Sequence, residues 1–181
     1  MKRILRKYNS VIYGNYKKKS LGYGLALGVA LCLFALLKYL LNYLPSSPVT
    51  MSDNIALLLF TVVIVYLYRA GLPQGKMTLK EGFLIGFYSA VIGAVIYGMF
   101  MYLYSAAIDT QMPLRCGQTL QKIPEYAEYT PQQFAAMTKP SAIALQSIIY
   151  NVIMAVLWSL LVAVFLRTEK AETVNKNNKL K

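Results

Sequence analysis

The chain has 181 residues, of which 57% are hydrophobic and only 14% are charged, and its formal net charge is +12. This length leaves room for one compact unit, and so apolar a composition is typical of a membrane protein rather than a soluble domain. The sequence contains no histidine, the commonest general base near neutral pH and the commonest metal ligand. We therefore expect no catalytic, cofactor or metal site.

The first 19 residues, 1–19, form a basic arm. Apolar residues between Met1 and Ile12 recur at helical spacing, with lysines and arginines between them, which predicts an amphipathic helix. We expect this helix to lie in the membrane interface and to end at Gly14 and Asn15. The alternative is that it docks on a cytoplasmic partner.

Four long apolar stretches follow the arm and predict a bundle of four transmembrane helices. About 20 apolar residues cross the hydrocarbon core, and the second stretch approaches this length if it is extended back to Met51 or forward through the rings of Tyr66 and Tyr68. The transmembrane domain covers residues 20–168, with an outer loop at 105–140, and a basic polar tail follows at 169–181. The predicted spans are residues 21–44, 51–68, 82–104 and 143–166.

The connections between the spans alternate in charge. The arm, the connection after the second span and the tail are rich in lysine and arginine, whereas the connection between the first two spans has neither. Basic connections favour the cytoplasmic side, so this pattern predicts that the N-terminus and the C-terminus are both cytoplasmic. We therefore attribute the positive charge to orientation and to attraction by anionic lipids at the cytoplasmic face, not to nucleic acid.

Two helix starts have capping signals. Thr78 and Glu81 have the spacing of a capping box at the start of the third span. Thr130 and Gln133 have the same spacing inside the outer loop, with a proline in the first turn, and predict a short helix at Pro131–Met137.

The two cysteines lie far apart in the predicted topology. Cys32 falls within the first span and Cys116 falls in the outer loop. They cannot meet unless the loop reaches the middle of the membrane, so we expect no internal disulfide.

The third span has a small residue at every fourth position, and the first span has a shorter version of the same pattern. Small residues let helix backbones approach closely in lipid, where burying larger apolar side chains gains little. We expect the first and third spans to pack together, and a homodimer through this face is the alternative. The predicted helix-packing face consists of Gly24, Gly28, Gly82, Gly86, Ala90, Ala94 and Gly98.

Polar side chains in the outer halves of the spans are the candidate functional residues. A cation at membrane depth is costly, so Lys38 in the first span is a candidate site for a phosphate or carboxylate. The simpler alternative is that Lys38 extends its amine to the outer interface while neighbouring amides bond between helices. The possible polar pocket consists of Lys38, Asn42, Tyr97, Gln146, Tyr150 and Asn151.

The order of these elements resembles a known family. The segment R-x-G-L-P-x-G-K-M-T-L-K-E-G begins at Arg69 and leads into the third span, Y-T-P-Q-Q-F begins at Tyr129, and the last span ends in F-L-R from Phe165. Together with the basic arm and a short outer turn, this layout over residues 17–168 resembles the Bacteroidota membrane family catalogued as domain of unknown function 4199.

The resemblance implies a multi-pass protein of the bacterial inner (cytoplasmic) membrane, with no established activity and no functional residue to carry over. Genes of this family often lie beside one for a membrane-associated glycosyltransferase, which implies an accessory role in polyprenyl-linked sugar chemistry. We therefore expect a non-enzymatic accessory or scaffold subunit with a membrane protein partner. The alternative is a small homodimeric carrier or lipid- or anion-binding protein that uses the pocket around Lys38. An enzyme comes third.

Overall fold

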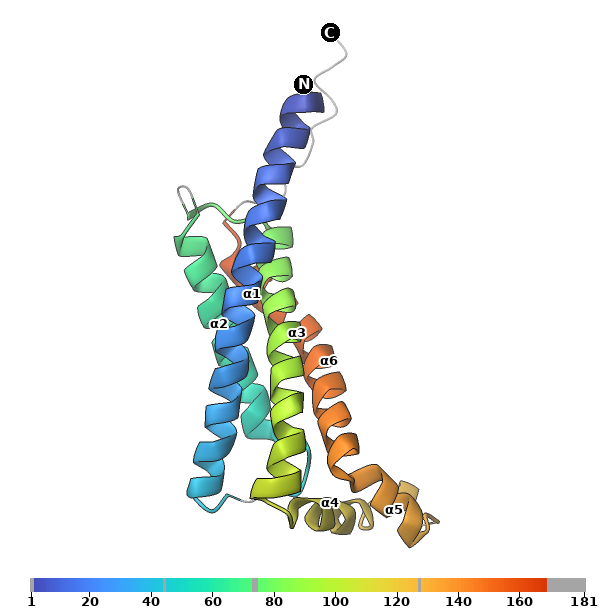
Figure 1. Cartoon of the computed structure of the whole chain (residues 1–181). Helices are drawn as coiled ribbons and strands as arrows, with labels where there is room; N and C mark the ends of the chain where they lie inside the picture. The colour runs from blue at the N-terminus through green and yellow to red at the C-terminus, as the bar shows by residue number, and fades with distance from the viewer. Residues whose placement is uncertain (1, 44, 73–74, 127, 169–181) are drawn as a thin grey trace.

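In the computed structural model, the chain forms a bundle of four long helices, with shorter helices lying across one end (Figure 1). The structure describes the backbone of residues 2–43, 45–72, 75–126 and 128–168, and the side chains from residue 18 onward within these ranges. The long helices are α1 (Lys2–Leu40), α2 (Met51–Ala70), α3 (Leu79–Leu103) and α6 (Pro140–Leu166). The short ones are the π-helix η2 (Tyr104–Ile108), α4 (Met112–Leu120), the 3-10 turn η3 (Pro124–Tyr126) and α5 (Pro131–Thr138). The described ranges contain no strand, which confirms the all-helical prediction.

Within the described residues, four helices are long and apolar enough to cross a membrane. The stretches that meet this condition are residues 18–40, 51–70, 79–108 and 140–166. Many of their outward side chains are large and apolar: Leu33 of α1 is 60% exposed and Ile153 of α6 is 57% exposed. Such an outward face suits hydrocarbon rather than water. The fold therefore has the four spans that the sequence predicts.

The limits of α1 differ from the prediction at both ends. The helix runs without interruption from Lys2, so the predicted end at Gly14 and Asn15 is wrong, and the arm continues α1 beyond the ends of α2 and α3 (Figure 1). At its other end α1 stops at Leu40, before the predicted limit of 44. Asn42 there has a positive φ of 57°, and the bonds from Asn42 N to Tyr39 O and from Tyr43 N to Lys38 O complete a Schellman motif.

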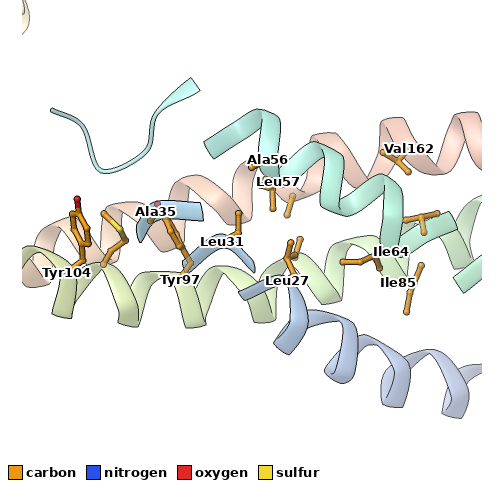
Figure 2. Packing of buried hydrophobic residues seen from close by; sticks show 14 of the residues in the cluster. Leu27, Leu31, Ala35, Ala56, Leu57, Ile64, Ile85, Tyr97, Tyr104 and Val162 are labelled. Carbon is orange, nitrogen blue, oxygen red and sulfur yellow. The ribbon is translucent and has the colours of Figure 1, made fainter. Parts of the chain in front are cut away.

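Helix α3 lies between α1 and α6 and packs most extensively against these two (Figure 1). On the α1 side the backbones come close: a Cβ added at Gly24 would lie 2.9 Å from the carbonyl oxygen of Ser89, and the Ser89 hydroxyl donates to Ser20 O at 3.4 Å. The buried apolar cluster fills the space between the four helices (Figure 2). The first and third spans therefore pack directly against each other.

The regular small-residue stripe of α3 faces α6 rather than α1. Gly82 lies against Ala163, and Gly86 lies against Ser159. A Cβ at Gly98 would lie 2.2 Å from Ile148 Cγ1, and the alanines at 90 and 94 are fully buried. The stripe therefore serves packing within the chain, where it lets α3 and α6 approach.

One end of the bundle, which we call the basic end, joins α1, the α2–α3 connection and the end of α6. Arg69 donates to Leu166 O at 3.4 Å, and Met77 N donates to the Thr168 hydroxyl at 2.7 Å. The Lys19 ammonium lies 5.4 Å from the centre of the Tyr68 ring. The basic residues at this end whose side chains the structure describes are Lys18, Lys19, Arg69, Lys76, Lys80 and Arg167. The tail at 169–181 lies outside the described residues.

The opposite end, which we call the loop end, contains the α1–α2 turn and the segment between α3 and α6. The capping prediction for α5 is confirmed, because the Thr130 hydroxyl accepts from Gln133 N and the helix begins at Pro131. The capping box at Thr78 and Glu81 is likewise present at the start of α3. Helices α4 and α5 lie across the loop end (Figure 1).

Candidate functional site

The loop end contains a buried ion pair between Lys38 of α1 and Asp53 of α2. The Lys38 ammonium donates to Asp53 Oδ1 at 2.5 Å. Both residues are almost fully enclosed, with 8% of Lys38 and 3% of Asp53 exposed. An isolated charge at this depth would be costly, and pairing offsets that cost. Lys38 is therefore held by a partner within the chain, between the last turn of α1 and the first turn of α2.

Local structure places both members of the pair. Asp53 lies in the first turn of α2, where its Oδ2 accepts from the Thr50 backbone N–H and from the Thr50 hydroxyl, each at 2.7 Å. Lys38 lies in the last turn of α1, where its positive charge is also attracted by the partial negative charge of the helix C-terminus. The short turn between the helices brings these two positions together.

Aromatic rings and a hydroxyl complete the surroundings of the Lys38 ammonium. It lies 5.3 Å from the centre of the Phe34 ring and 5.9 Å from that of Tyr43, and it donates to the Thr50 hydroxyl at 3.2 Å. Cation–π contacts of this kind contribute about 0.5–2 kcal/mol each. The positive charge of Lys38 is therefore stabilised by a carboxylate, a hydroxyl and two aromatic rings.

A small cavity adjoins the ion pair. The centre of a water molecule can occupy about 10 Å³ of this cavity, so it has space for roughly one water. Ala35, Tyr97 and Tyr104, three of its lining residues, are labelled in Figure 2. The Tyr97 side chain is 2% exposed and interacts with the Asp53 carboxylate. The full lining is Ala35, Lys38, Pro45, Ser47, Pro48, Asp53, Tyr97, Met101 and Tyr104.

A second ion pair, between Arg115 of α4 and Asp109, lies beside this cavity. Asp109 follows the π-helical turn η2 and is 6% exposed. The Tyr104 hydroxyl donates to Asp109 Oδ2 at 3.4 Å, and Arg115 Nε donates to Pro45 O at 3.3 Å. Arg115 therefore connects the outer loop to the α1–α2 turn through a hydrogen bond.

The structure separates the six residues of the predicted pocket. Lys38 and Tyr97 line the same cavity. Asn42 is exposed in the Schellman turn, and the Asn151 amide donates to Ser147 O of its own helix at 2.7 Å. The other two, Gln146 and Tyr150, line a shallow groove of about 340 Å³ beside the turn at 47–49.

Sequence reasoning missed the charged partners at the loop end. Asp53 is the first acidic residue of the chain and stands three residues after Thr50, a capping signal like the one at Thr78 and Glu81. Asp109 and Arg115 lie in the predicted outer loop at positions that match no motif. Their pairing has no local signature, because it depends on how η2 and α4 fold back over the turn.

The two ion pairs, which we call the loop-end cluster, are balanced in charge and leave little free space beside them. The cluster holds two cations and two carboxylates, each cation bonded to one carboxylate. An added anion would have to displace Asp53 or Asp109 and would bury excess negative charge. In this conformation the cluster therefore suits structural support better than ligand binding.

Cys116 lies next to this cluster and, like Cys32, is a free thiol. Burial raises the pKa of Cys116 to about 11, and the Asp109 carboxylate adds to the rise, although the neighbouring Arg115 opposes it. At pH 8 we expect roughly 100-fold less thiolate than for a thiol with a pKa of 9.0, so alkylation should be correspondingly slow and should quicken as pH rises toward 11.

Iodoacetamide labelling in a Cys32→Ala background tests this prediction. The matched control is Cys116→Ala/Gln118→Cys in the same background, which places a thiol on the exposed side of α4. Equal labelling rates for the two thiols at pH 8 would show that Cys116 is not shielded.

The comparisons with known proteins are consistent with this fold. A family model described as Protein of unknown function (DUF4199) matches residues 22–168, which is most of the chain. No curated protein and no solved structure matches the chain. The match begins within α1 and ends just after α6, so it includes all four membrane-spanning helices and the loop-end cluster. The chain belongs to the family Protein of unknown function (DUF4199).

Proposed function

We propose that this protein is a non-enzymatic accessory subunit of a membrane complex. One observation carries the proposal: the charges at the loop end are paired within the chain around space for about one water. A transported solute or a substrate needs a larger and less balanced cavity. The same charges fix α1, α2 and the outer loop in one arrangement, as a scaffold requires.

The alternative function is a homodimeric carrier or a lipid- or anion-binding protein acting around Lys38. Binding there would require Asp53 to release the Lys38 ammonium. The groove beside Gln146 and Tyr150 is wide enough for part of a lipid, but Lys38 is not among its lining residues. The geometry therefore favours the accessory subunit.

The surface proposed to receive the partner is an apolar groove between α3 and α6. It encloses about 430 Å³ and lies between two membrane-spanning helices, so a membrane-spanning helix of the partner can reach it and a soluble domain cannot. The resemblance to the family points to a glycosyltransferase of polyprenyl-linked sugars as that partner. The lining residues are Gly98, Met99, Tyr102, Leu103, Ser141, Ala144, Leu145 and Ile148.

Photo-crosslinking in the native membrane tests the partner proposal. A photoreactive residue at Leu145, which is 57% exposed in the groove, should give one discrete protein adduct. The same residue at Leu33 of α1, which is 60% exposed outside the groove, should give mainly lipid adducts. Lipid adducts alone at both positions, or an adduct with a second copy at Leu145, would contradict the proposal.

We also propose that the basic end faces the cytoplasm, in the inner membrane of a bacterium. Its support is the gathering of lysines and arginines there, whereas Lys38 and Arg115 at the loop end are paired with carboxylates. An impermeant maleimide applied to intact spheroplasts should label Lys122→Cys at the loop end and spare Lys76→Cys at the basic end, with both native cysteines replaced. The reverse pattern would invert the topology.

A further inference from the structure

The cavity at the loop end is lined by the first ion pair and by one residue that contacts the second. Its lining includes Lys38, Asp53 and Tyr104. The Tyr104 hydroxyl is itself bonded to Asp109, the carboxylate of the second pair. A chain of polar groups therefore runs from Asp109 in the outer loop through Tyr104 to the cavity, and the Lys38–Asp53 pair lines the same cavity.

The size and the lining of the cavity both match one water molecule. The centre of a water molecule can occupy about 10 Å³ of the cavity, which leaves space for roughly one water, and a buried water usually makes about three hydrogen bonds. The Tyr104 hydroxyl donates to Asp109 and the Ser47 hydroxyl donates to Val49 O, so both keep lone pairs that can accept from a water. Asp53 and Tyr97 also line the space.

We propose that one water molecule binds in this cavity and joins the two ion pairs through the hydroxyls of Tyr97 and Tyr104. The first turn of α2 and the outer loop then form one hydrogen-bonded unit. A change at Asp109 or Arg115 reaches Asp53, in the first turn of α2, through this bridge. This coupling does not depend on the proposed accessory function.

A direct contact could also couple the outer loop to α2, and the test has to separate the two routes. Arg115 donates to Pro45 O, so any change of Arg115 loosens the α1–α2 turn without involving a water. Removing only a tyrosine hydroxyl leaves that contact in place. Phenylalanine keeps the ring and nearly all of the volume, so Tyr97→Phe and Tyr104→Phe should both fold.

A double-mutant cycle of thermal unfolding midpoints tests the bridge. Each single variant should lower the midpoint, and the double variant should lower it by clearly less than the sum of the two single losses, because both single changes remove the same bridging water. Each change also removes one direct contact of its own, that of Tyr97 with Asp53 or that of Tyr104 with Asp109, and these two contributions should add. Tyr97→Phe combined with Tyr150→Phe is the control, since Tyr150 accepts from Asn54 outside the cavity, and these two losses should add. Additive losses for Tyr97 and Tyr104 would overturn the proposal.

Hydrogen exchange gives a second, local readout. The backbone amides of Asp53 and Asn54, which donate to Thr50 O, should exchange about fivefold faster in Tyr104→Phe than in the unaltered protein. Lys122→Gln, an exposed change in the same outer loop, should leave them unchanged. Unchanged exchange in Tyr104→Phe would show that no bridge reaches α2.

Discussion

Replacing Asp53 with asparagine should lower the free energy of unfolding by about 3–5 kcal/mol, because it leaves the Lys38 ammonium buried and unpaired. The asparagine carbonyl can still accept from the Thr50 N–H. Most of the decrease in the free energy of unfolding should therefore come from the broken ion pair rather than from the helix cap. Unfolding in mixed micelles or bicelles, followed by helix content or steric trapping, measures the change.

The matched control is Glu81→Gln at the basic end. Glu81 accepts from the N–H and the hydroxyl of Thr78, just as Asp53 accepts from those of Thr50. Altering this helix cap should lower the free energy of unfolding by at most about 1 kcal/mol. The double variant Lys38→Met/Asp53→Asn should recover more than half of the loss, since no charge is then stranded. Equal losses for Asp53→Asn and Glu81→Gln would mean that the ion pair contributes little.

Replacing Gly98 with alanine should lower the free energy of unfolding by about 1–3 kcal/mol through overpacking. The new Cβ would lie 2.2 Å from Ile148 Cγ1 and 3.1 Å from the carbonyl oxygen of Ala144. Ile148 can change rotamer, but the Ala144 backbone can retreat only if α3 and α6 separate. Chemical denaturation of the folded protein in detergent provides the measurement.

Gly22→Ala provides the opposite case in α1. A Cβ at Gly22 meets no atom within 4 Å, so the substitution adds only helix propensity, worth up to about 1 kcal/mol in favour of folding. A loss of stability at Gly98 together with no loss at Gly22 identifies close packing as the cause. Similar effects at both positions would indicate a general response to alanine.

The features that depend on local physics were predictable from the sequence. Hydropathy predicted the four spans, and the T-x-x-E and T-P-Q-Q patterns predicted the starts of α3 and α5. α6 begins at Pro140, three residues before the predicted span, because a proline is well accommodated in the first turn of a helix.

The features that depend on tertiary contacts were not predictable. Helix α4 follows Gln111, whose side chain makes no capping bond, and it buries Met112 and Cys116. The small residues of α3 indicate a face for close packing, but their spacing does not say whether α1 or α6 meets it. Lys38 likewise marks a costly charge, whereas its partner Asp53 becomes evident only when the α1–α2 turn is folded.

Native mass spectrometry of the protein released gently from its natural membrane tests the central claim most directly. The account predicts a complex with a second membrane protein at fixed stoichiometry. In that complex this subunit should carry no solute or lipid whose retention depends on Lys38. A homo-oligomer that holds such a ligand and loses it in Lys38→Met would contradict the account in favour of a carrier, and a lipid-free monomer would contradict both.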